Sequence, residues 1–117
     1  MPGTQNNFRH PGEELARRHF LDKGYTELGH NYHARSAEID LILMDPEGTI
    51  HFIEVKSWKE SRDFHPLESF HPLKIHKVKK AAEKYLSTHP EAQGKSCSFD
   101  LFWLKENGET EHFPNLF

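Results

Sequence analysis

The fold of this chain is decided by Glu38-Ile39-Asp40-Leu41-Ile42 and, after a turn, by Phe52-Ile53-Glu54-Val55-Lys56. Each stretch is a run of apolar, strand-forming residues interrupted by acids, which a buried strand does not normally carry. Between the two runs, Asp45-Pro46-Glu47-Gly48 supplies residues that favour a turn. The pair therefore predicts an antiparallel β-hairpin.

The register of this hairpin decides whether its acids lie together, because strand side chains alternate between two faces. One register places Met44 opposite Ile50 and leaves a five-residue loop between the strands. In this register Asp40 lies across from Glu54, and Lys56 shares their face. A four-residue loop without a bulge would instead turn Asp40 to the other side. We predict the first register, which brings two carboxylates and a lysine to one end of the hairpin.

Two carboxylates beside a lysine suit the hydrolysis of phosphodiester bonds. Asp40 and Glu54 offer hard oxygen ligands for Mg2+ or Mn2+, which keep several waters and accept phosphate oxygens of a substrate. Such a metal lowers the pKa of a bound water and offsets the charge that develops at phosphorus. Lys56 would orient the attacking water or hold a phosphate oxygen. The alternative is an ion-paired surface hairpin, and the spacing of the three residues alone leaves both interpretations open.

Away from the acids, the hairpin is apolar on both faces. Ile39, Leu41 and Leu43 are predicted to face one side, and Ile42, Met44, Ile50 and Phe52 the other. Coverage of both faces is typical of a central sheet between helices. The acids occupy only the end nearer Glu38 and Lys56, and this segregation favours a site over a solvated face.

A helix is predicted over residues 11–23, ended by Gly24. Its inward stripe contains Ala16 and Phe20, and Glu13 falls in the same sector. An acid on a buried stripe is costly unless it has a partner. The helix dipole by itself favours a glutamate in the first turn. Beside a metal site, however, Glu13 becomes a candidate for a further ligand, direct or through water.

The remaining elements complete a mixed α/β domain. They are a strand over residues 25–32 before the hairpin, a second helix over 72–88, a strand from Ser96 and a short last strand from Glu111. The predicted order is helix, three strands, helix, strand and short strand, which gives a mixed sheet flanked by helices. Residues 1–9 are predicted to be a flexible arm and residues 10–117 a single domain.

Positive charge is concentrated on the second predicted helix, where Lys74, Lys77 and Lys80 lie three residues apart. A lysine row is usually a solvated helix face, but this one is also our candidate for contact with nucleic acid. Lys74, in the first turn, would reach the metal site itself. Arg35, in the turn before the hairpin, is a further candidate for phosphate contact, although a solvated turn arginine is the commoner outcome.

Composition limits the class of protein. The chain has 117 residues, a formal net charge of −3 and a single cysteine. The lone Cys97 excludes an internal disulfide framework and fits a reducing cytoplasm, and its place in a strand-like run predicts a buried side chain. No apolar run approaches the roughly 20 residues of a membrane span, so we expect a cytoplasmic protein without membrane contact. The slightly acidic charge counts against strong nonspecific binding to nucleic acid.

Several motifs occur in the order of one known family. They are Gly12-Glu13-Glu14-Leu15-Ala16, Asn31, Arg35, Ala37-Glu38-Ile39-Asp40-Leu41-Ile42, Phe52-Ile53-Glu54-Val55-Lys56, Pro66, Lys74, Phe99-Asp100 and His112 to Phe117. Through them the chain resembles the YraN family of small bacterial proteins. That family belongs to the PD-(D/E)xK nuclease superfamily and is similar to archaeal Holliday-junction resolvases. The resemblance implies a restriction-endonuclease-like α/β fold.

The resemblance also implies roles for individual residues. Asp40, Glu54 and Lys56 match the catalytic triad of the superfamily. Glu13 matches the acid that resolvase-like members carry on the first helix. The implied metal ligands are Asp40, Glu54 and Glu13, and the implied cofactor is Mg2+ or Mn2+. Family membership implies a nuclease-like fold, and a fold does not by itself establish chemistry.

Three functions follow as hypotheses. The leading one is a divalent-metal-dependent, resolvase-like endonuclease acting on structured or branched DNA, with DNA favoured over RNA. A homodimer would suit it, because resolvases cut two strands. The alternative is a noncatalytic nucleic-acid-binding module that keeps the nuclease fold. The third is a histidine-based zinc protein, for which His30-x-x-His33 is the close pair and no cysteine supports it.

Overall fold

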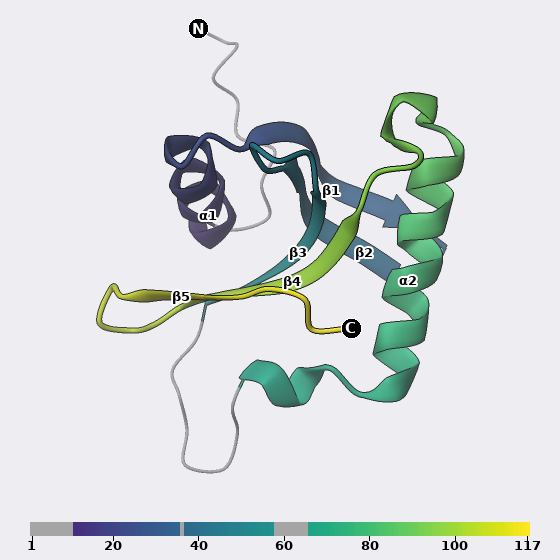
Figure 1. Ribbon diagram of the computed structural model, residues 1–117. Coiled ribbons are helices and arrows are strands. Elements are labelled where there is room, and N and C mark those ends of the chain that lie inside the picture. The colour runs from purple at the N-terminus through teal and green to yellow at the C-terminus, as the bar shows by residue number, and fades with distance from the viewer. Residues whose placement is uncertain (1–10, 36, 58–65) are drawn as a thin grey trace, which may run out of the picture.

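Two helices and five strands make up the part of the chain that the computed structural model describes, residues 11–35, 37–57 and 66–117 (Figure 1). In chain order the elements are α1 (Pro11–Asp22), β1 (Thr26–Ala34), β2 (Ala37–Met44), β3 (Ile50–Ser57), the 3-10 turn η2 (Pro66–Ser69), α2 (Pro72–Ser87), the 3-10 turn η3 (Pro90–Ala92), β4 (Cys97–Leu104) and β5 (Thr110–Phe113). The predicted order of helices and strands is confirmed. The predicted arm, residues 1–9, lies outside the described residues.

The strands form one sheet in the order β1-β2-β3-β4-β5. Neighbouring strands are antiparallel except β3 and β4, which run parallel. A parallel pair needs a crossover connection, and α2 lies in the connection between β3 and β4. The result is the mixed sheet flanked by helices that the sequence predicts.

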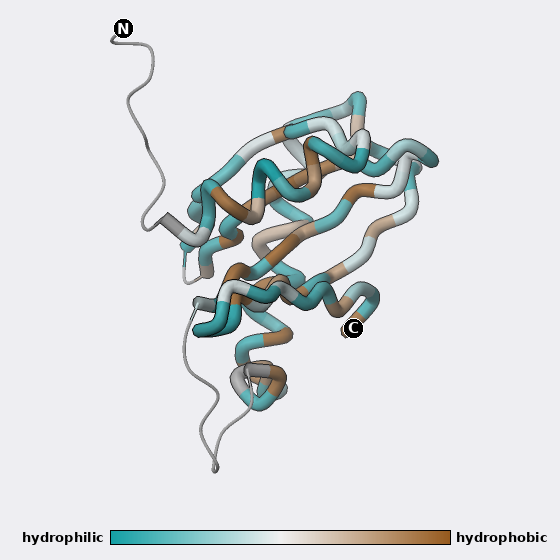
Figure 2. Tube along the Cα trace, turned by 90° about the vertical axis from the view of Figure 1, so that its left-hand side faces the viewer, coloured by the Kyte–Doolittle hydropathy of each residue, from teal (hydrophilic) through white to brown (hydrophobic). Residues whose placement is uncertain are grey.

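The two helices cover opposite faces of the sheet (Figure 1). The buried cluster under α1 contains Ala16, Phe20, Leu41, Leu43, Ile53, Val55, Phe102 and Leu104, and the cluster under α2 contains Ile39, Ile42, Ile50, Phe52, Ala81, Ala82, Tyr85 and Ala92. Hydrophobic positions recur along the strands and both helices in alternation with hydrophilic ones (Figure 2). Full burial of one large apolar side chain contributes about 1.5–3 kcal/mol, so these two clusters supply the main stabilisation of the fold.

Ile39 faces the side of the sheet opposite to the one predicted. It packs in the cluster under α2, whereas Leu41 and Leu43 pack in the cluster under α1. Residues two apart in a strand normally share a face. The side chains of β2 therefore change sides across Asp40, and this change coincides with a bond from Asp40 to the backbone of β3 that is described below.

Asp45 builds the turn between β2 and β3. Its Oδ1 accepts hydrogen bonds from the backbone amides of Glu47 at 2.9 Å and Thr49 at 3.0 Å. The amide of Gly48 donates to the Asp45 carbonyl at 2.9 Å, with a φ of 94° that glycine adopts without strain. These bonds fix the five-residue loop on which the register of the hairpin depends.

The helix ends follow the predicted sequence signals. α1 ends at Asp22, one residue before the predicted end, and the amide of Gly24 donates to the Leu21 carbonyl at 3.0 Å. α2 begins at Pro72 as predicted and ends at Ser87 rather than residue 88. At its start, His71 Nδ1 accepts a hydrogen bond from the amide of Lys74 at 3.4 Å.

Cys97 is exposed, which corrects the prediction of a buried cysteine. It is the first residue of β4, and the buried positions of that strand begin with Ser98. The predicted strand is therefore confirmed, but its first side chain lies outside the buried core. None of the helices in the described ranges has the length and apolar character needed to cross a bilayer.

Candidate metal and phosphate site

The β2–β3 hairpin has the predicted register. Met44 pairs with Ile50, and the ladder continues to Leu41 paired with Ile53. The described pairs end there, and Asp40 is the next residue of β2 beyond them. The hairpin therefore carries its acids at the end away from the turn.

Asp40 binds the backbone of β3 directly. Its Oδ2 accepts a hydrogen bond from the amide of Val55 at 2.8 Å, and the residue is 7% exposed. A buried carboxylate needs donors, and a backbone amide supplies one that cannot move without distorting the sheet. This bond holds the carboxylate beside the stretch of β3 that carries Glu54 and Lys56.

Glu54 is flanked by two lysines. Its Oε2 lies 2.8 Å from the Nζ of Lys56 and 2.5 Å from the Nζ of Lys74. The contact with Lys56 confirms that the two β3 side chains share a face. Lys74 comes from the first turn of α2, and its Nζ also lies 5.1 Å from the centroid of the Phe70 ring. The Glu54 side chain is 16% exposed, so these charges interact at the edge of the core rather than in open solvent.

Glu13 is fully buried on α1. α1 covers one face of the sheet and α2 covers the other. Lys74 reaches Glu54 from α2. Within the described ranges, the three acid or histidine side chains close enough to share an ion are not the predicted set Asp40, Glu54 and Glu13. That group lies elsewhere, as described below.

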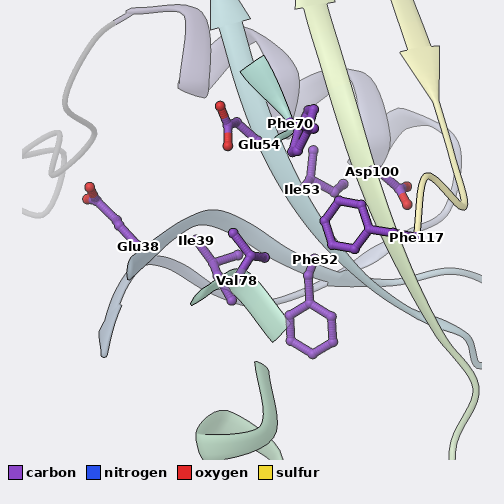
Figure 3. A pocket seen from close by; sticks show the side chains of 9 residues that line it. All are labelled: Glu38, Ile39, Phe52, Ile53, Glu54, Phe70, Val78, Asp100 and Phe117. Atoms are coloured by element: carbon purple, nitrogen blue, oxygen red, sulfur yellow. The ribbon is translucent and has the colours of Figure 1, made fainter. Parts of the chain in front are cut away.

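A small apolar hollow adjoins Glu54 on the α2 side of the sheet (Figure 3). It is lined by Glu38, Ile39, Phe52, Ile53, Glu54, Phe70, Val78, Asp100 and Phe117. In Figure 3 the carboxylates of Glu38 and Glu54 point away from the apolar side chains of Ile39, Val78 and Phe52. The acids therefore form a polar rim beside an aromatic and aliphatic floor.

The other predicted phosphate contacts lie on α2 and in the turn between β1 and β2. Lys77 is half-buried, whereas Lys80 is exposed and its Nζ lies 3.6 Å from Glu83 Oε1. Arg35 is exposed in the turn between β1 and β2, with a φ of 42°. Of the four predicted cations, Lys74 is the one for which the structure shows contact with a predicted acid.

The histidine pair proposed for zinc is not brought together. His30 Nδ1 lies 2.8 Å from Glu27 Oε2, and His33 Nε2 lies 3.3 Å from Glu38 Oε2. Both histidines belong to β1, but each contacts a different glutamate, His30 one of its own strand and His33 one of β2. The two histidines therefore make separate contacts with Glu27 and Glu38.

Sequence reasoning missed a buried polar cluster on the α1 side of the sheet. Asp100 Oδ2 accepts hydrogen bonds from His51 Nδ1 and His112 Nε2, both at 2.6 Å. Burial raises the pKa of Asp100, but the hydrogen bonds from His112, His51 and Ser98 outweigh it and lower the pKa to about 2. Burial likewise lowers the pKa of His51, yet its bonds to Asp100 and Asp45 outweigh this and raise the pKa. The one available signal was an acid at position 100 inside a run of apolar strand residues.

Comparison with known proteins places the chain among relatives of similar length. Residues 12–104 match the model of a family described as uncharacterised protein family UPF0102. A UPF0102 protein of Chlorobium phaeobacteroides is 40% identical over 115 residues, which cover 91% of this chain and 90% of that protein. A UPF0102 protein of Syntrophomonas wolfei is 38% identical over 109 residues, covering 91% and 93%. One from Helicobacter hepaticus is 37% identical over 113 residues, covering 94% and 96%. None of these names states an activity.

Proposed function

This chain belongs to the UPF0102 family, and on that footing we propose that it is a divalent-metal-dependent endonuclease that hydrolyses phosphodiester bonds in structured or branched DNA. Membership confirms the family predicted from the motifs, and the family name assigns no chemistry. One observation carries the proposal: the Asp40 carboxylate is fixed on the amide of Val55, between Glu54 and Lys56 in the sequence. The fold we assign is restriction-endonuclease-like, with the mixed five-stranded sheet as its core.

The acids present fit a hard divalent cation. Asp40 and Glu54 offer carboxylate oxygens, which are the ligands that Mg2+ and Mn2+ prefer, and Glu13 on α1 would support them through a water rather than directly. When bound, the ion would supply charge neutralisation at phosphorus and a water of lowered pKa.

The lysines have roles on the substrate side. Lys56 and Lys74 share one oxygen of Glu54 in this structure. An ion held by Glu54 would weaken its attraction to both ammonium groups, because the carboxylate charge would then be neutralised by the metal. Lys56 would orient the attacking water, and Lys74 would contact a phosphate oxygen. Lys77 and Lys80 would extend this contact along α2, and Arg35 would add one from the turn before β2.

The test is a cleavage screen with the full chain. Wild type is incubated with Mg2+ or Mn2+ and a four-way junction, a forked duplex, a linear duplex, single-stranded DNA or RNA. We expect metal-dependent cutting of the branched DNA, loss of cutting in Asp40→Asn, and retention in Glu109→Gln, which alters an exposed acid in the β4–β5 turn. Failure of wild type to cut any substrate with either metal would overturn the proposal.

A noncatalytic nucleic-acid-binding module is the second candidate. The double ion pair of Glu54 favours it, because the two lysines already neutralise this carboxylate. Such a module would bind DNA equally well with Mn2+ and with a chelator, and Asp40→Asn would leave its affinity unchanged. Binding that strengthens several-fold with Mn2+ in wild type but not in Asp40→Asn would exclude it.

A further inference from the structure

Three side chains converge beneath α1, on the face of the sheet away from Lys74. The strand registers explain the convergence: His51 of β3 pairs with Ser98 of β4, and His112 of β5 pairs with Phe102 of β4. Asp100 lies midway between Ser98 and Phe102 and shares their face. It is therefore the diagonal neighbour of both histidines, one from each flanking strand.

The potential ligand atoms of this triad meet around one point. His51 Nδ1 and His112 Nε2 each lie 2.6 Å from Asp100 Oδ2, and all three atoms lie within 4.8 Å of one another. His51 and Asp100 are buried, and the side chain of His112 is 22% exposed. The site thus has a fixed inner wall and one open side at β5, the edge strand.

Each inner ligand is held by a second polar group. His51 Nε2 lies 2.9 Å from Asp45 Oδ2, the residue that also builds the β2–β3 turn. Asp100 Oδ1 accepts hydrogen bonds from Ser98 Oγ at 2.5 Å and from the amide of Asn115 at 3.4 Å. A carboxylate on the far nitrogen of a histidine is the usual outer support of a metal-binding imidazole. This arrangement turns one nitrogen of His51 and one oxygen of Asp100 toward His112.

The hydrogen-bonded form of this cluster fixes the protonation of His51. Ionised carboxylates only accept hydrogen bonds, so His51, which lies between Asp45 and Asp100, must carry a proton on both ring nitrogens. The resulting positive charge lies at a position that is 6% exposed and is compensated by these two carboxylates. A metal ion in place of the inner protons would leave His51 neutral, with its Nε2 proton donated to Asp45. The two histidines and one carboxylate would then be in the protonation states that metal ligands require.

We propose that His51 Nδ1, Asp100 Oδ2 and His112 Nε2 bind one borderline divalent transition ion, with Zn2+ as the representative. Two imidazoles and a carboxylate are a ligand set for zinc, and a water on the exposed side of His112 completes a tetrahedron. With metal–ligand bonds of about 2.0–2.2 Å, the ligand atoms must separate to roughly 3.3 Å. The short edge strand β5, which carries His112, would supply part of this movement, and a rotation of the Asp100 carboxylate would have to separate it from His51 Nδ1. The ion would fasten β5 to β4 and β3, and it is independent of the Asp40 site.

The test is a titration of metal-free full-length protein with Zn2+ and with Co2+. Wild type is expected to bind one equivalent of Zn2+ by calorimetry, to melt at a higher temperature with Zn2+, and to show the visible absorption of tetrahedral Co2+. His112→Asn is expected to lose at least tenfold in affinity together with the Co2+ spectrum. Asp45→Asn, which changes the group on His51 Nε2 and keeps an oxygen for the turn amides, should lose about 10–100-fold. His76→Asn, on the exposed side of α2, and Asp40→Asn should bind Zn2+ as wild type does.

Two results would overturn the proposal. If wild type takes up no Zn2+ and gives no tetrahedral Co2+ spectrum, the triad is a hydrogen-bonded network only. If Zn2+ binds but His112→Asn and Asp45→Asn leave its affinity unchanged, the ion sits elsewhere. Far-ultraviolet circular dichroism of each variant establishes that it is folded before the titration. This titration measures Zn2+ binding, so a protein that cuts no DNA could still confirm the zinc site. Asp40→Asn, which should bind Zn2+ normally but not cut DNA, separates the two sites.

Discussion

The ammonium group of Lys74 lies 2.5 Å from Glu54 Oε2, and this contact joins the first turn of α2 to β3. Lys56 approaches the same oxygen at 2.8 Å. Two positive charges therefore surround a carboxylate that our proposal assigns to a metal. In that scheme the lysines and the cation compete for Glu54, and the side chain of Lys74 regulates how strongly the site binds metal.

Lys74→Met tests this competition. Removal of one charge beside Glu54 is worth about 1 kcal/mol at the protein surface, so we expect the affinity for Mn2+ to rise by roughly three- to tenfold. DNA affinity should fall, because a phosphate contact is lost. Calorimetry with Mn2+ and fluorescence anisotropy with a labelled four-way junction measure the two effects.

Lys77→Met, which removes the same charge one turn further along α2, is the matched control for Lys74→Met. It should weaken DNA binding without raising the affinity for Mn2+. Equal Mn2+ affinities for wild type and Lys74→Met would show that Glu54 does not hold the metal.

The bond between Asp40 and Val55 separates structural from chemical loss at this position. Asp40→Ala removes the acceptor of a buried amide and is expected to cost about 1–3 kcal/mol in the free energy of unfolding. Asp40→Asn keeps an oxygen for the amide of Val55, so it should lose less than half of that. Both variants should lose Mn2+ binding. Urea unfolding and calorimetry check the two quantities, and an Asn variant that binds Mn2+ like wild type contradicts the assigned ligand role.

The hairpin register was predictable because it depends on local chemistry. Asp45 and Gly48 select a five-residue loop, and the loop then fixes which residues of β2 and β3 face each other. The side change at Ile39 was not predictable in this way. It accompanies a hydrogen bond from the backbone amide of Val55 to the Asp40 side chain. Every residue except proline has such an amide, so no sequence pattern marks the partner.

Lysines of α2 are expected to bind phosphate through charge alone. Lys77→Glu and Lys80→Glu should each weaken binding to DNA of any sequence and reduce the slope of log affinity against log salt by about 1. Lys23→Glu, after the end of α1, is the control with the same change in net charge. Anisotropy titrations at several salt concentrations give the slopes. Slopes that fall equally in all three variants would show that only net charge matters.

The triad of His51, Asp100 and His112 could not be assembled from the sequence. Its members lie on three strands, and their meeting requires both the parallel register of β3 on β4 and the antiparallel register of β5 on β4. A crossover through a helix leaves a parallel register open, unlike a short hairpin loop. The turn between β4 and β5 was recognisable from its Asn-Gly pair, but a single hairpin brings only His112 to Asp100.

Glu27 links the end of the first strand hairpin to α1 and gives the fold a pH dependence away from both candidate metal sites. Its Oε1 lies 2.5 Å from Arg17 Nε and its Oε2 lies 2.8 Å from His30 Nδ1. Burial raises the pKa of Glu27, but the hydrogen bonds from Arg17 and His30 outweigh it and hold the pKa below the ordinary value of 4.5. The folded state therefore binds this proton more weakly than the unfolded state does.

Because the folded state binds this proton more weakly, the stability that Glu27 contributes is present above about pH 4.5. It is lost as the pH falls through the lower folded-state pKa. At about pH 7, Glu27→Gln should reduce the free energy of unfolding by about 0.5–1 kcal/mol, as expected for a partly exposed ion pair. The difference from wild type should shrink steadily below about pH 4.5. Urea unfolding across this range measures it, with Glu109→Gln as an exposed control that should show little difference at any pH. A gap between wild type and Glu27→Gln that stays constant down to about pH 3 would mean that the contribution of Glu27 comes from packing rather than from its charge.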